Sequence, residues 1–256
     1  MNSIEERTKI LFCGDSAIAV QFGETADIET NLMVRALDLA LKEAHIRGVV
    51  ETVPTYRSEM IHYNPLIIPY KKLCEAVEEL MKGVDWDSIK PSNEVVVVPI
   101  YYKDPKAEIK SVAEYEHISE EDVIRIHTNR YHYAFMMGVA PGTAYLSSPT
   151  GSFTIPRKSV PVPKPYASSI QIWSTHTTIS PFHSQSGWHM IGRVPACCYN
   201  PKRPEDPFLV TPGQWVRFRS IEEDEFEYIE QEFLNNRYER ELIHKDLSEL
   251  PFSRST

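Results

Sequence analysis

The sequence predicts an α+β protein with two domains, on three observations. Strand and helix patterns alternate in the first 90 residues, and short apolar runs separated by turn residues dominate the second half. Between the two halves the periodic pattern lapses. A chain of 256 residues is long enough for two small cores. We place an α+β domain at residues 1–90, a β-rich domain at 91–222, and a C-terminal helix and tail at 223–256.

The first domain is predicted to begin with two strands and a helix. Residues 9–12 form a short apolar run and residues 16–22 alternate between apolar and polar side chains. From Asp27, which suits an N-cap, apolar residues recur with helical spacing as far as Ala44. Gly48 ends this unit.

Two more strands and a second helix complete the predicted first domain. Residues 49–54 and 59–63 have the composition of strands. Pro69 suits the first turn of a helix, and Gly83 closes that helix. The order predicts a small sheet with helices on one face.

The second domain is predicted to be mainly β. Residues 95–100 form a β-branched apolar run that is typical of a buried strand, and Ser119 begins a helix with a start like a capping box. Many short strands between turns predict a closed barrel or a sandwich. Residues 221–235 are expected to be helical, and residues 236–256 to form a peripheral tail.

Composition excludes several classes of function. The net charge of −9 and the scattered basic residues argue against a nucleic-acid partner. No apolar run approaches the roughly 20 residues that span a bilayer, and the N-terminus lacks the pattern of a signal peptide. We therefore expect no membrane partner and a cytoplasmic location. The adjacent Cys197 and Cys198 are either redox-active or alternate in and out on a strand.

A resemblance to a known family rests on several stretches in a fixed order. They are Gly14–Ala17 with Val20–Gly23, Gly48–Ser58 with His62–Pro65, Ser119–His127, Met137–Gly142 with Tyr145–Leu146, Ile155–Arg157, and Gly187–Pro195 with Pro212–Gly213. Together they resemble the family of KipI, the B subunit of 5-oxoprolinase and allophanate hydrolase subunit 1, over about residues 8–230.

The resemblance implies a fold and a function. It implies a small α+β N-terminal domain followed by a cyclophilin-like β-barrel domain. It also implies a component of an ATP-dependent 5-oxoprolinase, or of a related amidohydrolase or carboxylase assembly, that cleaves a small anionic amide. The implied partner is a second cyclophilin-like protein of the KipA type, equivalent to the C subunit of 5-oxoprolinase, and the implied cofactor is ATP. Because the sequence contains neither GxxxxGK[ST] nor GxGxxG, we expect a nucleotide site that is unorthodox or shared with a partner, and a chain that is inactive alone.

An alternative function remains open at this point. Six positions that are glycine in the family carry other residues here, namely Ser168, Gln171, Ser174, Thr175, Thr178 and Ser186. Glycine serves where φ is positive or where backbone approaches a ligand closely, so these changes favour a non-catalytic, KipI-like kinase inhibitor or binding subunit. Prolyl isomerase activity is a third, weaker option, because fold does not imply function.

Arg157 and His176 are the candidate catalytic residues. Arg157 follows Ile155 and Pro156 at the mouth of the presumed barrel, where a guanidinium can hold a carboxylate or phosphate through two parallel bonds. Its alternative role is a salt bridge on the rim. His176 can serve in hydrogen bonding or acid–base chemistry, or it is an exposed polar strand residue.

Candidate substrate-binding residues come from a turn and from neighbouring strands. Gly138, Pro141 and Gly142 lie in a tight turn that either offers backbone amides to an anion or is structural. Tyr145 follows that turn, and Thr177 matches the family's threonine.

His127 and Arg193 are weaker candidates for substrate binding. His127 ends the capped helix, where a cation also favours the helix dipole. For Arg193, stacking or pairing at the barrel wall is the main alternative.

His176, His183 and His189 have spacings that suit no helix, so no metal site is expected. We expect the aromatic residues near Trp173, Phe182, Trp188 and Trp215 to contribute to an interface with another protein of the assembly.

Overall fold

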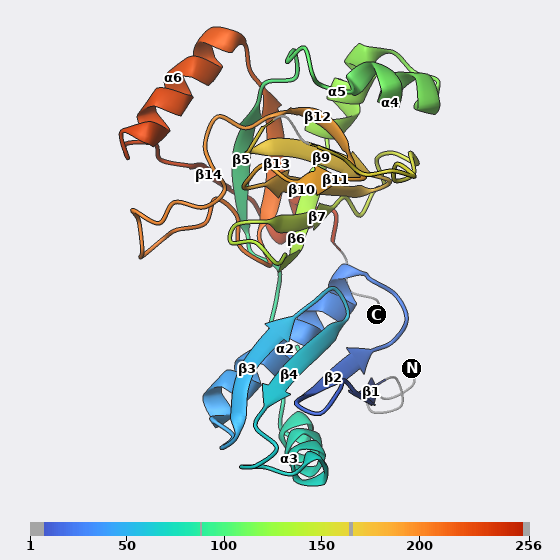
Figure 1. Ribbon diagram of the computed structural model, residues 1–256, viewed down its shortest axis with the longest axis vertical. Helices are drawn as coiled ribbons and strands as arrows, with labels where there is room; N and C mark the ends of the chain where they lie inside the picture. Colours follow the sequence, from blue (N-terminus) through green and yellow to red (C-terminus); the bar gives the residue numbers. More distant parts are fainter. Residues whose placement is uncertain (1–7, 88, 164–165, 253–256) are drawn as a thin grey trace. The chain divides into compact units, whose positions relative to one another are not determined.

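The computed structural model describes residues 8–87, 89–163 and 166–252. The chain divides into two compact units, residues 1–91 and residues 92–255, and each has a core of its own (Figure 1).

The first unit is a four-stranded antiparallel sheet with two helices. Along the sheet the strands are β1 (Thr8–Phe12), β2 (Ala17–Phe22), β4 (Ser58–Tyr63) and β3 (Val49–Pro54). The helices are α2 (Ile28–Ala44) and α3 (Tyr70–Lys82), and α2 lies along one face of the sheet (Figure 1). Apolar side chains of β2, β4 and both helices form its core, so the strands and helices predicted for this half are present.

The helices of the first unit begin and end at the residues that suit those positions. The side chain of Asp27 accepts a hydrogen bond from the backbone N–H of Thr30 at 2.7 Å, and so caps α2. Pro69 is the N-cap of α3, one residue before the predicted position in the first turn. The backbone N–H of Gly83 donates to the carbonyl of Leu80 at the other end.

Glu59 is a buried acid in this core. Its side chain is 0% exposed, and neither carboxyl oxygen has a hydrogen-bond partner of normal geometry among the described residues. Burial and the nearby Asp38 raise the pKa of Glu59 to about 9, and Lys42 and the Val53 amide oppose this only in part. Glu59 is therefore protonated at neutral pH.

The second unit contains one curved sheet of eight strands. In sheet order the strands are β12 (His189–Arg193), β9 (Ser169–Trp173), β10 (His176–Ser180), β7 (Ala144–Ser147), β6 (Tyr131–Met137), β13 (Trp215–Ser220), β5 (Glu94–Ile100) and β14 (Glu241–His244). Neighbours are antiparallel except β13 and β5, which are parallel. A small second sheet pairs β8 (Val162–Pro163) with β11 (Gln185–Ser186).

Three helices accompany this sheet. They are α4 (Ile109–Glu116), α5 (Glu120–Thr128) and α6 (Glu223–Leu234), and a 3-10 turn follows at Leu247–Glu249. The hydroxyl of Ser119 accepts from the backbone N–H of Asp122 at 3.0 Å, as the capping pattern predicted.

The segment expected to be a peripheral tail contributes a strand instead. Residues 241–244 form β14, which pairs antiparallel with β5 at the edge of the eight-stranded sheet. Three of its four residues are exposed. Its sequence, Glu-Leu-Ile-His, does not alternate between apolar and polar residues, so it gave no strand signal.

No continuous ladder of backbone hydrogen bonds joins the edge strand β12 to the opposite end of the eight-stranded sheet. An isolated bridge links Tyr101, just after β5, to Arg193 at the end of β12, through backbone hydrogen bonds of 2.9 and 3.0 Å. The second unit is thus a mixed α/β structure with a strongly β core. The expected cyclophilin-like closed barrel is not confirmed, because this contact is a single bridge.

Two of the serines at family glycine positions keep a left-handed backbone. The φ angles of Ser168 and Ser174 are 56° and 52°. Ser174 and Thr175 form the two-residue loop between β9 and β10, where glycine is preferred at positive φ. The backbone at these two positions therefore stays left-handed without glycine, and this conformation is strained for a residue with a Cβ atom.

In the part of the chain that the structure describes, no helix has the length and apolar character needed to span a membrane.

We expect Glu59→Gln to stabilise the first unit increasingly as pH rises. The folded state keeps the proton of Glu59 between pH values of about 4.5 and about 9, where the unfolded chain has released it, so wild-type stability falls through this window. Relative to the wild type, the substitution should raise the free energy of unfolding by on the order of 4 kcal/mol more at pH 8 than at pH 5. Urea titrations at both pH values measure this, with the exposed Glu51→Gln as control. A pH-independent effect of Glu59→Gln would contradict the buried acid.

We expect Ser174→Gly to stabilise the second unit by about 0.5–1 kcal/mol, because glycine relieves the left-handed strain. Ser174→Ala keeps a Cβ atom and should bring no such gain. Urea unfolding followed by tryptophan fluorescence compares the two variants. Equal midpoints for the two would show that the loop is unstrained.

Candidate functional site

Four aromatic side chains gather on the second unit. Trp173 ends β9 and His176 begins β10, and their rings stack at 4.9 Å between centroids with 19° between planes. Trp188 lies 5.8 Å from Trp173 and 6.4 Å from His176, and Tyr145 of β7 lies 5.8 Å from Trp188. We call Tyr145, Trp173, His176 and Trp188 the Trp173 cluster. It brings together two predicted site residues, His176 and Tyr145.

Arg157 lies over this cluster. The carbon of its guanidinium is 6.0 Å from the centroid of the Trp173 ring, and the side chain is exposed. Within the described residues it makes no ion pair or hydrogen bond, so its five donors remain open to a ligand. The predicted alternative, a salt bridge on the rim, is not formed by those residues.

Gly187 allows the segment of Arg157 to approach. A Cβ atom at Gly187 would lie 3.3 Å from the carbonyl oxygen of Lys158 and 3.7 Å from Nε of Arg157. The backbone N–H of Lys158 donates to the carbonyl of Gly187 at 2.7 Å. Glycine at this position thus allows the close approach of the segment that carries Arg157.

His176 is half-buried. Burial lowers its pKa below the ordinary value, and a backbone hydrogen bond at Trp173 opposes this. Its Nδ1 is 3.5 Å from the hydroxyl of Thr175. His176 and the guanidinium of Arg157 both lie by the Trp173 ring. The lowered pKa favours an imidazole that can accept a hydrogen bond or a proton from a ligand held by Arg157.

In the predicted turn, Gly138 and Gly142 are tightly packed, whereas Pro141 is exposed. A Cβ atom at Gly138 would be 2.6 Å from the Tyr145 ring, and one at Gly142 would be 2.5 Å from the carbonyl oxygen of Cys198. Gly142 has a φ of 83°. The N–H of Gly138 donates within the turn, to the carbonyl of Thr143 at 2.6 Å. The turn therefore positions Tyr145, and at least this amide is not available to an anion.

His127 and Thr177 lie in the core and not with Arg157. His127 is 0% exposed and stacks on Phe218 at 4.3 Å. Its Nδ1 pairs with the hydroxyl of Tyr102 at 2.6 Å, and its Nε2 with the hydroxyl of Thr177 at 3.2 Å. Burial, with His132 nearby, holds the pKa of His127 well below its usual range. This chain of side chains is a buried polar network.

Arg193 contacts a different set of residues. It forms ion pairs with Asp104 at 3.7 Å and Glu230 at 3.6 Å, and it packs over the rings of Tyr166 and Phe226 at 4.2 and 4.5 Å. This matches the stacking and pairing that sequence analysis gave as its alternative role.

Trp173 and Trp188 were assigned by sequence analysis to a protein interface and missed as site residues. The signal for Trp173 was present, since a two-residue hairpin loop places the residues on its two sides opposite one another.

Among the described residues, no group of three or more His, Cys, Asp or Glu side chains is arranged to hold a metal ion.

The sequence and the fold match known proteins. A family model described as carboxyltransferase domain, subdomain C and D, matches residues 8–210. The chain is 28% identical over 237 residues to the B subunit of 5-oxoprolinase from Bacillus subtilis, covering 88% of this chain and 98% of that protein. It is 24% identical over 215 residues to the corresponding B subunit from Escherichia coli O157:H7, covering 83% and 96%. These matches confirm the resemblance found in the sequence.

Solved structures agree on the fold. TTHA0988 is 29% identical, with a TM-score of 0.70 over 80% of this chain, and the match spans 40% of that longer protein. The urea amidolyase of Kluyveromyces lactis gives a TM-score of 0.80 over 93% of this chain and 16% of its own, at 18% identity. The second likeness concerns the fold alone.

We expect Tyr102→Phe to destabilise the second unit by about 1–3 kcal/mol, because it leaves Nδ1 of the buried His127 without a partner. The adjacent Tyr101→Phe is the matched control, since the Tyr101 hydroxyl makes no hydrogen bond within the described residues. Thermal unfolding of both variants measures the difference. Equal losses for the two would argue against a structural network at His127.

Proposed function

The chain belongs to the family of carboxyltransferase domains, subdomain C and D, and we propose that it works as the B-type subunit of an ATP-dependent 5-oxoprolinase or a related amidohydrolase or carboxylase assembly. The observation that carries the proposal is the match to 98% of the length of a 5-oxoprolinase B subunit, combined with an unpaired guanidinium over an aromatic cluster. The partner is a second cyclophilin-like protein of the KipA type, the C-type component of such an assembly.

The substrate in this proposal is a small anionic amide. Arg157 binds its carboxylate through charge-assisted hydrogen bonds, which the open guanidinium can make in pairs. The Trp173 ring holds the guanidinium by a cation–π contact, and His176 and Tyr145 lie beside the bound amide. ATP binds where the partner completes the site, because the sequence contains no P-loop. The chain alone is inactive.

The cyclophilin-like closure of the eight-stranded sheet is part of the same proposal. Its support is the bridge between Tyr101 and Arg193, together with a core that collects side chains from β5, β6, β7, β9, β10, β12 and β13. A sheet that wraps one core in this way has few open edges.

A non-catalytic, KipI-like inhibitor or binding subunit is the second candidate. The observation that favours it is the loss of six family glycines around the candidate site. Among those positions, only Ser168 and Ser174 have a positive φ in this chain.

The experiment is calorimetric titration of the chain co-expressed with its C-type partner, using 5-oxoproline and ATP. We expect Arg157→Ala to weaken binding of 5-oxoproline by about 1.5–3 kcal/mol, the scale of a charge-assisted hydrogen bond. Arg157→Lys keeps the charge and loses the paired geometry, so its affinity should fall between those of the wild type and Arg157→Ala.

The fold should survive both substitutions, which circular dichroism checks. A wild-type complex that binds neither 5-oxoproline nor ATP would overturn the enzymatic proposal and support the inhibitor-like one. Unchanged binding in Arg157→Ala would remove Arg157 from the site.

A further inference from the structure

The backbone just before Arg157 is fixed by hydrogen bonds, whereas the Arg157 guanidinium has no hydrogen-bond partner within the described residues. The carbonyl of Ile155 accepts from the backbone N–H of Ser174 at 2.9 Å. The carbonyl of Pro156 accepts from Nε2 of His189 at 3.0 Å. An ordered stretch of chain therefore carries a side chain that is free to meet a ligand.

One carboxylate anchors the start of this stretch. The backbone N–H groups of Thr154 and Ile155 both donate to Oε1 of Glu116, at 2.6 and 2.7 Å. The hydroxyl of Thr154 donates to Oε2 of Glu116 at 3.1 Å. Hydrogen bonds to an ionised acceptor are about twice as strong as those between neutral groups. Glu116 thus joins α4 to the chain two residues before Arg157.

Glu116 is an unfavourable residue for the helix that carries it. It is the last residue of α4, and the last turn of this helix contains no basic residue. The C-terminal end of a helix carries a partial negative charge, which disfavours a carboxylate there. The backbone donors of Thr154 and Ile155 offset this charge. Glu116 therefore stabilises the stretch before Arg157 and not its own helix.

The neighbour of Arg157 on the other side, Lys158, is anchored to the opposite end of α4. Its Nζ pairs with Oε1 of Glu108, the N-cap residue of α4. The other oxygen of Glu108, Oε2, accepts from the backbone N–H of Met190 at 2.8 Å. Both carboxylates through which α4 contacts this stretch are thus occupied by groups other than the Arg157 guanidinium.

We propose that Glu116 is a positioning residue for the anion site at Arg157. Its carboxylate fixes the backbone of Thr154 and Ile155, and this holds the Arg157 guanidinium over the Trp173 ring before any ligand binds. A ligand carboxylate then meets an ordered guanidinium, so less binding free energy is lost to ordering. The ligand's identity rests on the proposed function, whereas the position of Arg157 is a property of the chain alone.

The first test measures the position of Arg157 without a ligand. The indole N–H resonance of Trp173 in the full chain, assigned with Trp173→Phe, should shift in Arg157→Ala because the guanidinium leaves the ring. Glu116→Ala should move the same resonance in the same direction by about half as much or more, although the guanidinium is still present. Glu116→Gln keeps a carbonyl oxygen for the two N–H groups, so its shift should be smaller than that of Glu116→Ala.

Two results of this measurement would overturn the proposal. If Glu116→Ala leaves the Trp173 resonance at its wild-type position, Glu116 is only a structural anchor. If Arg157→Ala causes no shift, the guanidinium does not lie over the ring.

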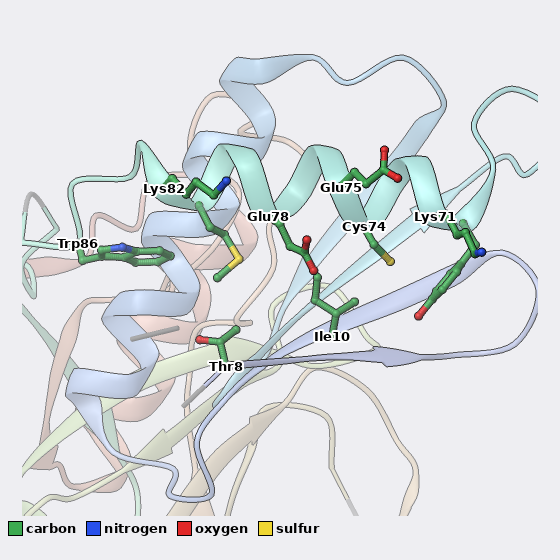
Figure 2. Close-up of a pocket in the computed structure, with 10 residues that line it drawn as sticks. Thr8, Ile10, Lys71, Cys74, Glu75, Glu78, Lys82 and Trp86 are labelled. Atoms are coloured by element: carbon green, nitrogen blue, oxygen red, sulfur yellow. The ribbon is translucent and has the colours of Figure 1, made fainter. Parts of the chain in front are cut away.

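Two further variants control for the loss of a carboxylate. Glu114→Ala removes an exposed carboxylate of α4 that makes no hydrogen bond or ion pair within the described residues. Glu78→Ala removes one from α3 in the first unit, where Glu78 extends toward Ile10 in a groove between β1 and α3 (Figure 2). Neither should move the Trp173 resonance. A shift in both as large as that of Glu116→Ala would also overturn the proposal.

The second test asks whether Glu116 acts through Arg157. In calorimetric titration of the complex with the C-type partner, Glu116→Ala should weaken binding of 5-oxoproline by about fivefold. In the Arg157→Ala background the same change should weaken binding by less than about twofold, because the group that Glu116 positions is gone. An equal loss in the two backgrounds would overturn the proposal.

The two proposals fail in different ways. A wild-type complex that binds no 5-oxoproline would overturn the proposed function. A Trp173 shift in Glu116→Ala would still support the positioning role of Glu116 in that case.

Discussion

The register of β10 against its two neighbours decides where the candidate site lies. His176 is paired with Trp173 of β9 and with Ser147 of β7, and Thr177 follows in the next position. Because side chains alternate along a strand, His176 lies with the Trp173 cluster while Thr177 enters the core and meets His127. A shift by one residue would exchange the two faces, so the cluster and the buried network depend on the same ladder.

Much of the fold could be predicted from local signals. Asp27 and Ser119 are N-cap residues that indicate where two helices begin, and apolar periodicity indicates the strands of the first unit. The helix α4 was missed because it combines a length of only eight residues with the lack of a capping side chain, and β14 was missed because most of it is exposed. In the site, Arg157 followed from the family motif, whereas His176 was a candidate because of its imidazole chemistry. The burial of His127 could not be predicted, since it depends on pairings between segments far apart in sequence.

The two units carry buried ionisable groups with opposite pH responses. Glu59 holds its proton up to a pKa of about 9, so the first unit loses stability as pH rises. In the second unit burial lowers the pKa of His132 to about 4, below that of the unfolded chain. There the unfolded state takes up the proton first, and stability is lost as pH falls from about 6.5 toward 4. The two windows overlap between about pH 4.5 and 6.5, where the two effects oppose each other, and above about pH 6.5 the loss caused by Glu59 continues alone.

The place of β5 between β13 and β14 has a consequence during synthesis. This run of four valines, Val95–Val98, pairs with β13 on one side and with β14 on the other, and both partners lie more than 100 residues later in the chain. At about 5–20 residues per second, the ribosome needs roughly 10–30 s to deliver residues 215–244 after β5 has been made. For that time a β-branched segment without charge has two unpaired edges, and such segments are prone to aggregate. Chaperone capture of nascent chains is thus expected to concentrate on this one strand.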